Sequence, residues 1–180
     1  MLVSPVFNIF GGNTGVSYFV SASNITVNSP TAIVGNYESR PTTNFGTEIT
    51  SVITADFIMA NDNSGLPTES CTSFGGDATG KIAIIRRGGC AFVEKVKNAQ
   101  DAGALAVIVV NRNDDNRTDY TPAAFTMGGS DNTITIPSVM ISGNYRNRIR
   151  NALNAGNVSV SLAFENFARS GRTVSPGIFY

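Results

Sequence analysis

The sequence of 180 residues contains no histidine. Imidazole is the usual base beside a nucleophilic serine or cysteine, a common zinc ligand, and the side chain whose unperturbed pKa lies near neutrality. Its absence excludes Ser-His and Cys-His nucleophiles and the usual zinc sites, and with them most hydrolase mechanisms. What remains is carboxylate-pair chemistry, a serine-lysine pair or a lysine Schiff base, with Lys81 and Lys95 as the candidate lysines.

Charge is also scarce. Thirteen basic residues balance thirteen acidic ones, and charged residues make up 14% of the chain. A balanced chain lacks the electrostatic attraction that dominates nonspecific nucleic-acid binding, so we expect no nucleic-acid partner. Asparagine, serine, threonine and glycine fill the polar positions instead, a composition common in exported β-rich proteins. We therefore expect a secreted, extracellular protein.

No long hydrophobic run is present. The longest, residues 104–110, is far shorter than the roughly 20 residues that cross a bilayer, so we expect no membrane insertion. The N-terminal residues MLVSPVFNIF lack the basic and continuous apolar regions of a signal peptide. We expect any export signal to lie upstream of Met1.

Nucleotide-binding motifs are missing as well. A strand, glycines and a helix follow one another around RRGGCAF, but neither GxGxxG nor GxxxxGK[ST] occurs, so no cofactor is predicted. Arg86 and Arg87 beside free amides could hold a carboxylate or sulfate. The alternative is that Gly88 and Gly89 provide positive φ angles for a tight turn while Phe92 packs into the core.

Alternating and continuous apolar segments predict a β-rich chain. The predicted strands cover residues 24–27, 31–34, 51–60, 81–85, 104–110, 136–142 and 158–165. Between them, NYESRPTTNFGTE and NDNSGLPTESCTSFGGDATG have the composition of turns.

Two helices are predicted among these strands. Apolar residues from Phe92 to Gly103 recur at helical spacing, and Lys95 lies on the opposite, polar face. This helix connects strands 81–85 and 104–110, which predicts a right-handed crossover between parallel strands. A second helix is predicted to be capped by Ser142 or Asn144 and to end before Gly156.

The only two cysteines are Cys71 and Cys90. A disulfide between them would close a loop and stabilise the folded state by roughly 3 kcal/mol in the chain-entropy model. Two unrelated thiols are the alternative. No CxxC spacing suggests a redox role, and two cysteines alone cannot provide four metal ligands.

Two stretches resemble the protease-associated domain, or PA domain, family. The first runs from Gly80 through the Arg87, Gly88, Cys90 and Phe92 spacing to AGALAVIVVN, and the second is IPSVMIS at residues 136–142. The family usually has a glycine at the start of its last helix, where this chain has Arg146.

The resemblance implies an α+β, β-rich fold: an open β-barrel or sandwich with a strand-helix-strand crossover and short flanking helices. It implies a domain over residues 25–165, which leaves residues 1–24 as an N-terminal arm or edge strand and residues 166–180 as a tail or linker. The family's upstream cysteine matches Cys71, which supports a Cys71–Cys90 disulfide. Its exposed, ligand-facing edge maps to Arg87, Gly88, Gly89 and Cys90.

The connection from residue 111 to 133 is longer than most loops in compact domains. Its large residues Tyr120, Phe125 and Met127 are candidate anchors for a peptide, together with Arg87 and Phe92 near the turn. The alternative is that the loop residues pack into the domain and hold the loop down.

Acidic residues of the same loop, Asp114, Asp115 and Asp119, are weak candidates for a calcium site. An EF-hand is excluded because Asn116 stands at its glycine position and Pro122 at its final glutamate position. The main prediction is that the chain holds no metal.

The resulting prediction is a noncatalytic module of an extracellular protease that recognises a polypeptide segment or modulates substrate access. Its partners would be a polypeptide substrate or an adjoining peptidase domain, and the isolated domain would be a monomer. The alternatives are a structural or adhesive spacer in a secreted or cell-surface protein, and an enzyme that uses Lys81 or Lys95.

Overall fold

The protein is described by a computed structural model that covers residues 17–63, 65, 67–113 and 122–170. Seven strands form a closed barrel in the order β1-β2-β6-β5-β4-β3-β7. The strands are β1 (Ser17–Ser29), β2 (Gly35–Pro41), β3 (Ile53–Met59), β4 (Ile82–Arg86), β5 (Ala106–Val110), β6 (Ser138–Ile141) and β7 (Ser159–Ser170). Two α-helices accompany them, α1 (Phe92–Asp101) and α2 (Arg146–Ala155), with short 3-10 helices η1 (Thr31–Ile33), η2 (Pro67–Glu69) and η3 (Gly143–Tyr145).

The crossover predicted from the sequence is present. Strand β4 leads through α1 into β5, and the two strands pair in parallel from Ile82↔Ala106 to Arg86↔Val110. The neighbouring pairs β3–β4 and β5–β6 are also parallel, and the others are antiparallel. The β-rich barrel is confirmed, although β7 pairs with both β1 and β3 and so closes a barrel that the sequence predicted to be open.

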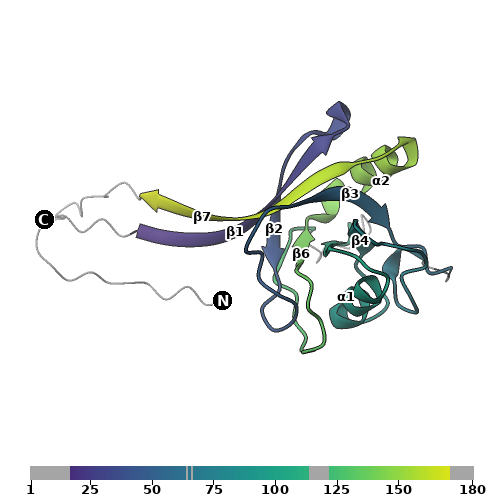
Figure 1. Ribbon diagram of the computed structural model, residues 1–180. Coiled ribbons are helices and arrows are strands. Elements are labelled where there is room, and N and C mark those ends of the chain that lie inside the picture. Colours follow the sequence, from purple (N-terminus) through teal and green to yellow (C-terminus); the bar gives the residue numbers. More distant parts are fainter. Residues whose placement is uncertain (1–16, 64, 66, 114–121, 171–180) are drawn as a thin grey trace, which may run out of the picture.

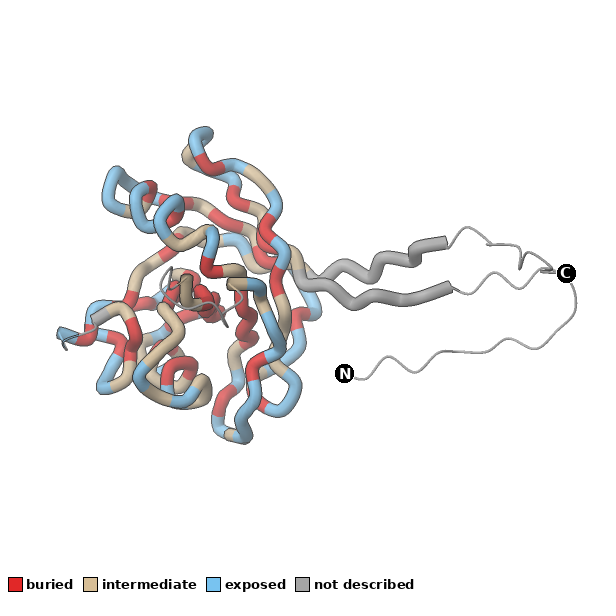
Figure 2. The backbone as a smooth tube through the Cα atoms, turned by 180° about the vertical axis from the view of Figure 1, so that it is seen from behind, coloured by how far each residue is buried: buried red, intermediate tan, exposed pale blue. Residues whose placement is uncertain are grey.

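Side-chain alternation divides the apolar residues into two clusters. Inward-facing residues of all seven strands, such as Ile84 and Ile108, form the barrel interior together with Ile149 and Ala152 of α2. The intervening residues of β4 and β5, such as Ile85 and Val107, form a second cluster with α1. Helix α1 therefore covers the outside of the sheet, α2 packs against the interior cluster, and buried residues line the centre of the domain (Figures 1 and 2).

Strands β1 and β7 are longer than the sequence pattern indicated. They pair from Ser17↔Ser170 to Ser29↔Ser159 and leave the barrel together as a two-stranded ribbon (Figure 1). Both strands cross the limits predicted for the domain at residues 25 and 165. The domain limits themselves stay a prediction.

The region after β1 differs from the prediction. Residues 31–34 do not form a strand, because the chain reverses direction there: Thr31–Ile33 is a 3-10 helix, and the Ile33 amide donates to the Pro30 carbonyl at 3.0 Å. Residues predicted as turns form β2 instead. Only Tyr37 and Ser39 of this strand are buried, so its polar composition concealed it.

The entrance to α2 explains why Arg146 is compatible with the family pattern. Ser142 accepts a hydrogen bond from the Asn144 amide at 3.2 Å and starts η3, which runs directly into α2. The glycine at this entrance is Gly143, not residue 146. A Cβ atom on Gly143 would lie 2.3 Å from the Arg112 carbonyl oxygen, so the backbone approach requires glycine.

This contact yields a stability prediction. We expect Gly143→Ala to lower the free energy of unfolding by about 1–3 kcal/mol or more, because backbone on both sides must move apart. The matched control is Gly76→Ala, since no atom lies within 4 Å of a Cβ atom built there. Denaturant unfolding of both variants measures the difference, and equal stability of the two would contradict the packing constraint.

Candidate functional site

The turn from β4 into α1, residues 87–92, is fixed by hydrogen bonds and a disulfide; we call it the disulfide corner. The Arg87 amide donates to the Val110 carbonyl at 2.9 Å and continues the β4–β5 ladder by one residue. Gly88 and Gly89 have φ angles of 143° and 67°, which confirms the predicted positive-φ turn. Cys90 is bonded to Cys71, as predicted. At the end of the corner, the Glu94 carboxylate accepts from the Ala91 amide at 2.9 Å and caps α1.

The space beside the two glycines is filled by the Glu69 carboxylate. A Cβ atom on Gly88 would lie 2.2 Å from Glu69 Oε1, and one on Gly89 would lie 2.5 Å from Oε2. Glu69 is buried and pairs with Arg86 Nη1 at 3.3 Å. The glycines are therefore required both by the turn and by the close approach of a buried acid.

Lys95 is fully buried, which corrects its predicted place on the polar face of the helix. Its Nζ donates to the Glu69 carbonyl oxygen at 2.5 Å and lies 3.4 Å from Cys71 Sγ. Asp62 accepts from the Cys71 amide at 3.0 Å in the same region. Lys95 thus fastens α1 to the segment that carries Cys71, and its burial argues against access to a substrate.

Burial lowers the pKa of Lys95 to about 8, while the nearby carboxylates of Glu69 and Asp62 partly oppose this shift. Desolvation disfavours the ammonium form, and the opposite charges favour it. Since the lowered value is still above neutrality, Lys95 is mainly protonated at pH 7.

On the outer side of the corner, three side chains form an aromatic patch: Arg87, Phe92 and Phe125. The Phe92 and Phe125 rings meet edge to face with centroids 6.0 Å apart, and the Arg87 guanidinium lies 4.9 Å from the Phe125 centroid. Arg87 Nη1 also donates to Asn111 Oδ1 at 3.0 Å. Phe125 is 36% exposed, whereas Phe92 is partly buried against the α1 cluster. A partner can therefore reach this patch without any rearrangement of the core.

The remaining predicted loop residues do not all join this patch. Met127 is completely buried in the α1 cluster, which favours the alternative that it holds the connection on the domain and corrects its predicted role as an anchor. Tyr120 and the calcium candidates Asp114, Asp115 and Asp119 lie outside the described residues. Within the described ranges, no three His, Cys, Asp or Glu side chains cluster as metal ligands would.

Arg86 and Arg87, predicted as one anion site, point in different directions. Arg86 pairs with the buried Glu69, whereas Arg87 contacts Asn111 and Phe125. Alternation along the strand places consecutive side chains on opposite faces. The sequence shows two adjacent arginines but not their different partners, because these depend on the position of Glu69 in the folded protein.

Comparison with known proteins agrees with this architecture. The sequence profile described as the PA domain matches residues 30–158. The chain belongs to the PA domain family. Its relatives include Aminopeptidase YwaD of Bacillus subtilis, 42% identical over 79 residues, and the ER degradation-enhancing alpha-mannosidase-like protein 3 of Xenopus laevis, 39% identical over 77 residues. These matches cover 44% and 41% of this chain but only 16% and 8% of the relatives.

Solved structures show the same fold. An aminopeptidase from Aneurinibacillus sp. strain AM-1 superposes with a TM-score of 0.59 at 24% identity, covering 84% of this chain and 33% of that protein. A zinc aminopeptidase from Bacillus subtilis gives 0.55 at 24% identity, with 84% and 32% covered. The PA domain thus corresponds to a minor part of longer proteins. None of the helices within its described ranges has the length and hydrophobicity of a membrane span.

Lys95 provides a pH-dependent prediction. Between pH values of about 8 and 10.5, the unfolded chain retains the lysine proton that the folded protein has lost. The free energy of unfolding should therefore rise with pH in this window relative to Lys95→Met, by at most about 1.4 kcal/mol per pH unit.

Lys97→Met is the control, because Lys97 is on the same helix and pairs with Asp101 at the surface. Urea unfolding at several pH values gives the comparison. Parallel pH profiles for the wild type and Lys95→Met would contradict the burial effect on the Lys95 ammonium group.

Proposed function

We propose that this PA domain is a noncatalytic module of an extracellular or lumenal protein that recognises a polypeptide segment beside a peptidase domain. The observation that carries the proposal is the partly exposed Phe125 ring, held by Arg87 and Phe92 at the edge of a disulfide-fixed corner. Aromatic and arginine side chains dominate the energies of many protein interfaces.

The rigidity of the corner supports this role. The disulfide, the capped helix and the buried Lys95 bond restrict the backbone that positions Arg87 and Phe92. A fixed surface loses less conformational entropy on binding than a loop that must first become ordered. The disulfide itself is consistent with the oxidising compartments in which such bonds persist.

Attachment beside another domain is supported by β1 and β7. The chain enters and leaves through paired strands, with Ser17 opposite Ser170 (Figure 1). Segments that begin and end close together are suited to insertion into a host protein. The similarity to aminopeptidases supports a peptidase as that host.

The patch chemistry predicts the kind of segment that binds. The flat face of Phe125 suits aromatic or aliphatic side chains, and the Arg87 guanidinium suits an acidic neighbour. We expect selection from a phage library of random peptides to enrich sequences in which an acidic residue lies near an apolar one.

Variants test whether the aromatic patch is responsible. We expect Arg87→Gln and Phe125→Ala each to weaken the selected peptides about tenfold or more, because each removes a central contact. Leu105→Ala is the control: Leu105 is 42% exposed and directly precedes β5, at the end of the strand opposite Val110. Retained affinity in both patch variants, or no enrichment at all, would instead favour a structural spacer.

A further inference from the structure

A pocket lies on the other face of β4, at the end of the barrel beside α2. It has a volume of about 90 Å³ and lies between α2 and the carboxyl ends of β3, β4 and β5. Ligands of sheets with parallel strands commonly bind beyond the carboxyl ends of those strands. The pocket is separate from the aromatic patch, because the side chains of Arg86 and Arg87 leave the strand in opposite directions.

The floor of the pocket is aliphatic. Met59, Ile84, Val110 and Ile149 come from β3, β4, β5 and α2, respectively. The last three are at most 4% exposed and belong to the cluster in the barrel interior, so their positions are fixed by packing. This floor offers apolar contact to a small group without disturbing the core.

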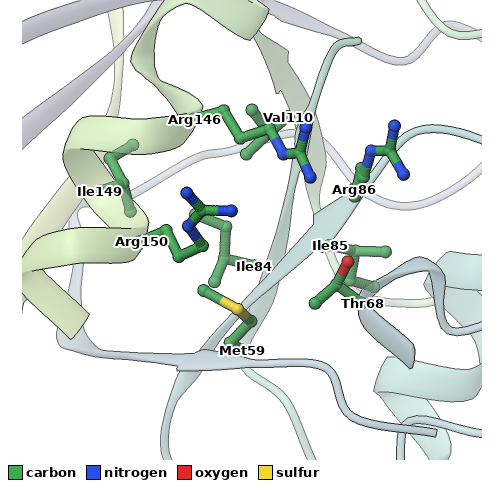
Figure 3. Close-up of a pocket in the computed structure, with 9 residues that line it drawn as sticks. All are labelled: Met59, Thr68, Ile84, Ile85, Arg86, Val110, Arg146, Ile149 and Arg150. Atoms are coloured by element: carbon green, nitrogen blue, oxygen red, sulfur yellow. The ribbon is translucent and has the colours of Figure 1, made fainter. Parts of the chain in front are cut away.

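The rim of the pocket is cationic. Arg86 extends from the end of β4, while Arg146 and Arg150 extend from successive turns of α2 toward the same space (Figure 3). Arg86 is already paired with the Glu69 carboxylate, which lies 3.3 Å from its Nη1, and Arg146 also has a partner within the protein. The first turn of α2 contains no acidic residue. The rim therefore places guanidinium groups, above all that of Arg150, beside an apolar floor, where they can donate to an anion.

We propose that this pocket binds a carboxylate borne on a short aliphatic group, as presented by a peptide that ends in leucine, isoleucine or valine. Guanidinium groups bind carboxylates through paired, charge-assisted hydrogen bonds, and the floor would cover the aliphatic side chain. A volume of about 90 Å³ suits a branched side chain and is too small for a nucleotide. An inorganic anion would use the arginines but gain nothing from the floor.

The probe is the peptide N-acetyl-Ala-Ala-Leu, titrated into the 180-residue protein by calorimetry and followed by amide NMR shifts. We expect a millimolar or tighter dissociation constant, with shifts at Ile84, Val110 and Ile149. Amidation of the terminal carboxylate should weaken binding about tenfold, because the arginines lose their charged acceptor. Replacing the last residue by glycine should also weaken binding, because the floor loses its contact.

A matched pair of arginines on α2 makes the test specific. Arg150→Gln should reduce affinity about fivefold or more through the lost charge-assisted bond. Arg148→Gln should keep wild-type affinity, because Arg148 donates to the Ala32 carbonyl at 3.1 Å and does not line the pocket. Circular dichroism of both variants checks that the fold is retained.

Each outcome has a defined meaning. Equal binding of 4-methylpentanoate would support the same chemistry and identify a free aliphatic acid as a sufficient ligand. The proposal is wrong if the acid and the amide bind equally, if phosphate binds more tightly than the peptide, if Arg148→Gln matches Arg150→Gln, or if no binding occurs at millimolar concentrations. None of these results depends on Arg87 or Phe125, so failure of the pocket proposal can be distinguished from failure of the proposed binding at the aromatic patch.

Discussion

The buried ammonium group of Lys95 holds together the part of the molecule where strand, helix and disulfide meet. It donates to the carbonyl oxygen of Glu69, and this places the Glu69 side chain beside Gly88, Gly89 and Arg86. A buried charge is costly unless hydrogen bonds and opposite charges compensate it, and Glu69 and Asp62 provide part of that compensation. The same ammonium group lies 3.4 Å from Sγ of Cys71, which is bonded to Cys90.

This arrangement explains why the residue types at the disulfide corner are specific for structural reasons. The two glycines leave space for the Glu69 carboxylate, and the positive charge of Lys95 lies close to it. The disulfide holds the segment that carries Cys71 against the start of α1. The Glu69 carboxylate and the Lys95 ammonium would each be destabilising without the other, because a buried charge needs a partner. Packing and charge pairing therefore suffice to explain why these residues match the family pattern.

The sequence could predict the elements whose pattern is local. The continuous apolar run before Asn111, the helical spacing from Phe92 to Ala99 and the glycine turn each depend on neighbouring residues, and all three are present. The sequence could not show that Lys95 is buried, since a lysine on a helix is usually exposed and its acceptor lies 26 residues away. Strand β2 was missed for a related reason, and burial of Met127 was only one of two alternatives, because both depend on contacts with distant strands.

The same limit applies to the two surfaces at the end of β4. Arg86 and Arg87 are adjacent in the sequence and suggest one anion site, but the pleat of the strand directs them to opposite faces. One face carries the aromatic patch over α1, and the other leads to the pocket beneath α2. Because β4 is paired with β3 as far as Ile84 and with β5 as far as Arg86, its pleat cannot rotate to bring the two arginines together. A polypeptide bound at one face would therefore have to pass around the end of the strand to reach the other, so the strand keeps the two proposed binding surfaces separate.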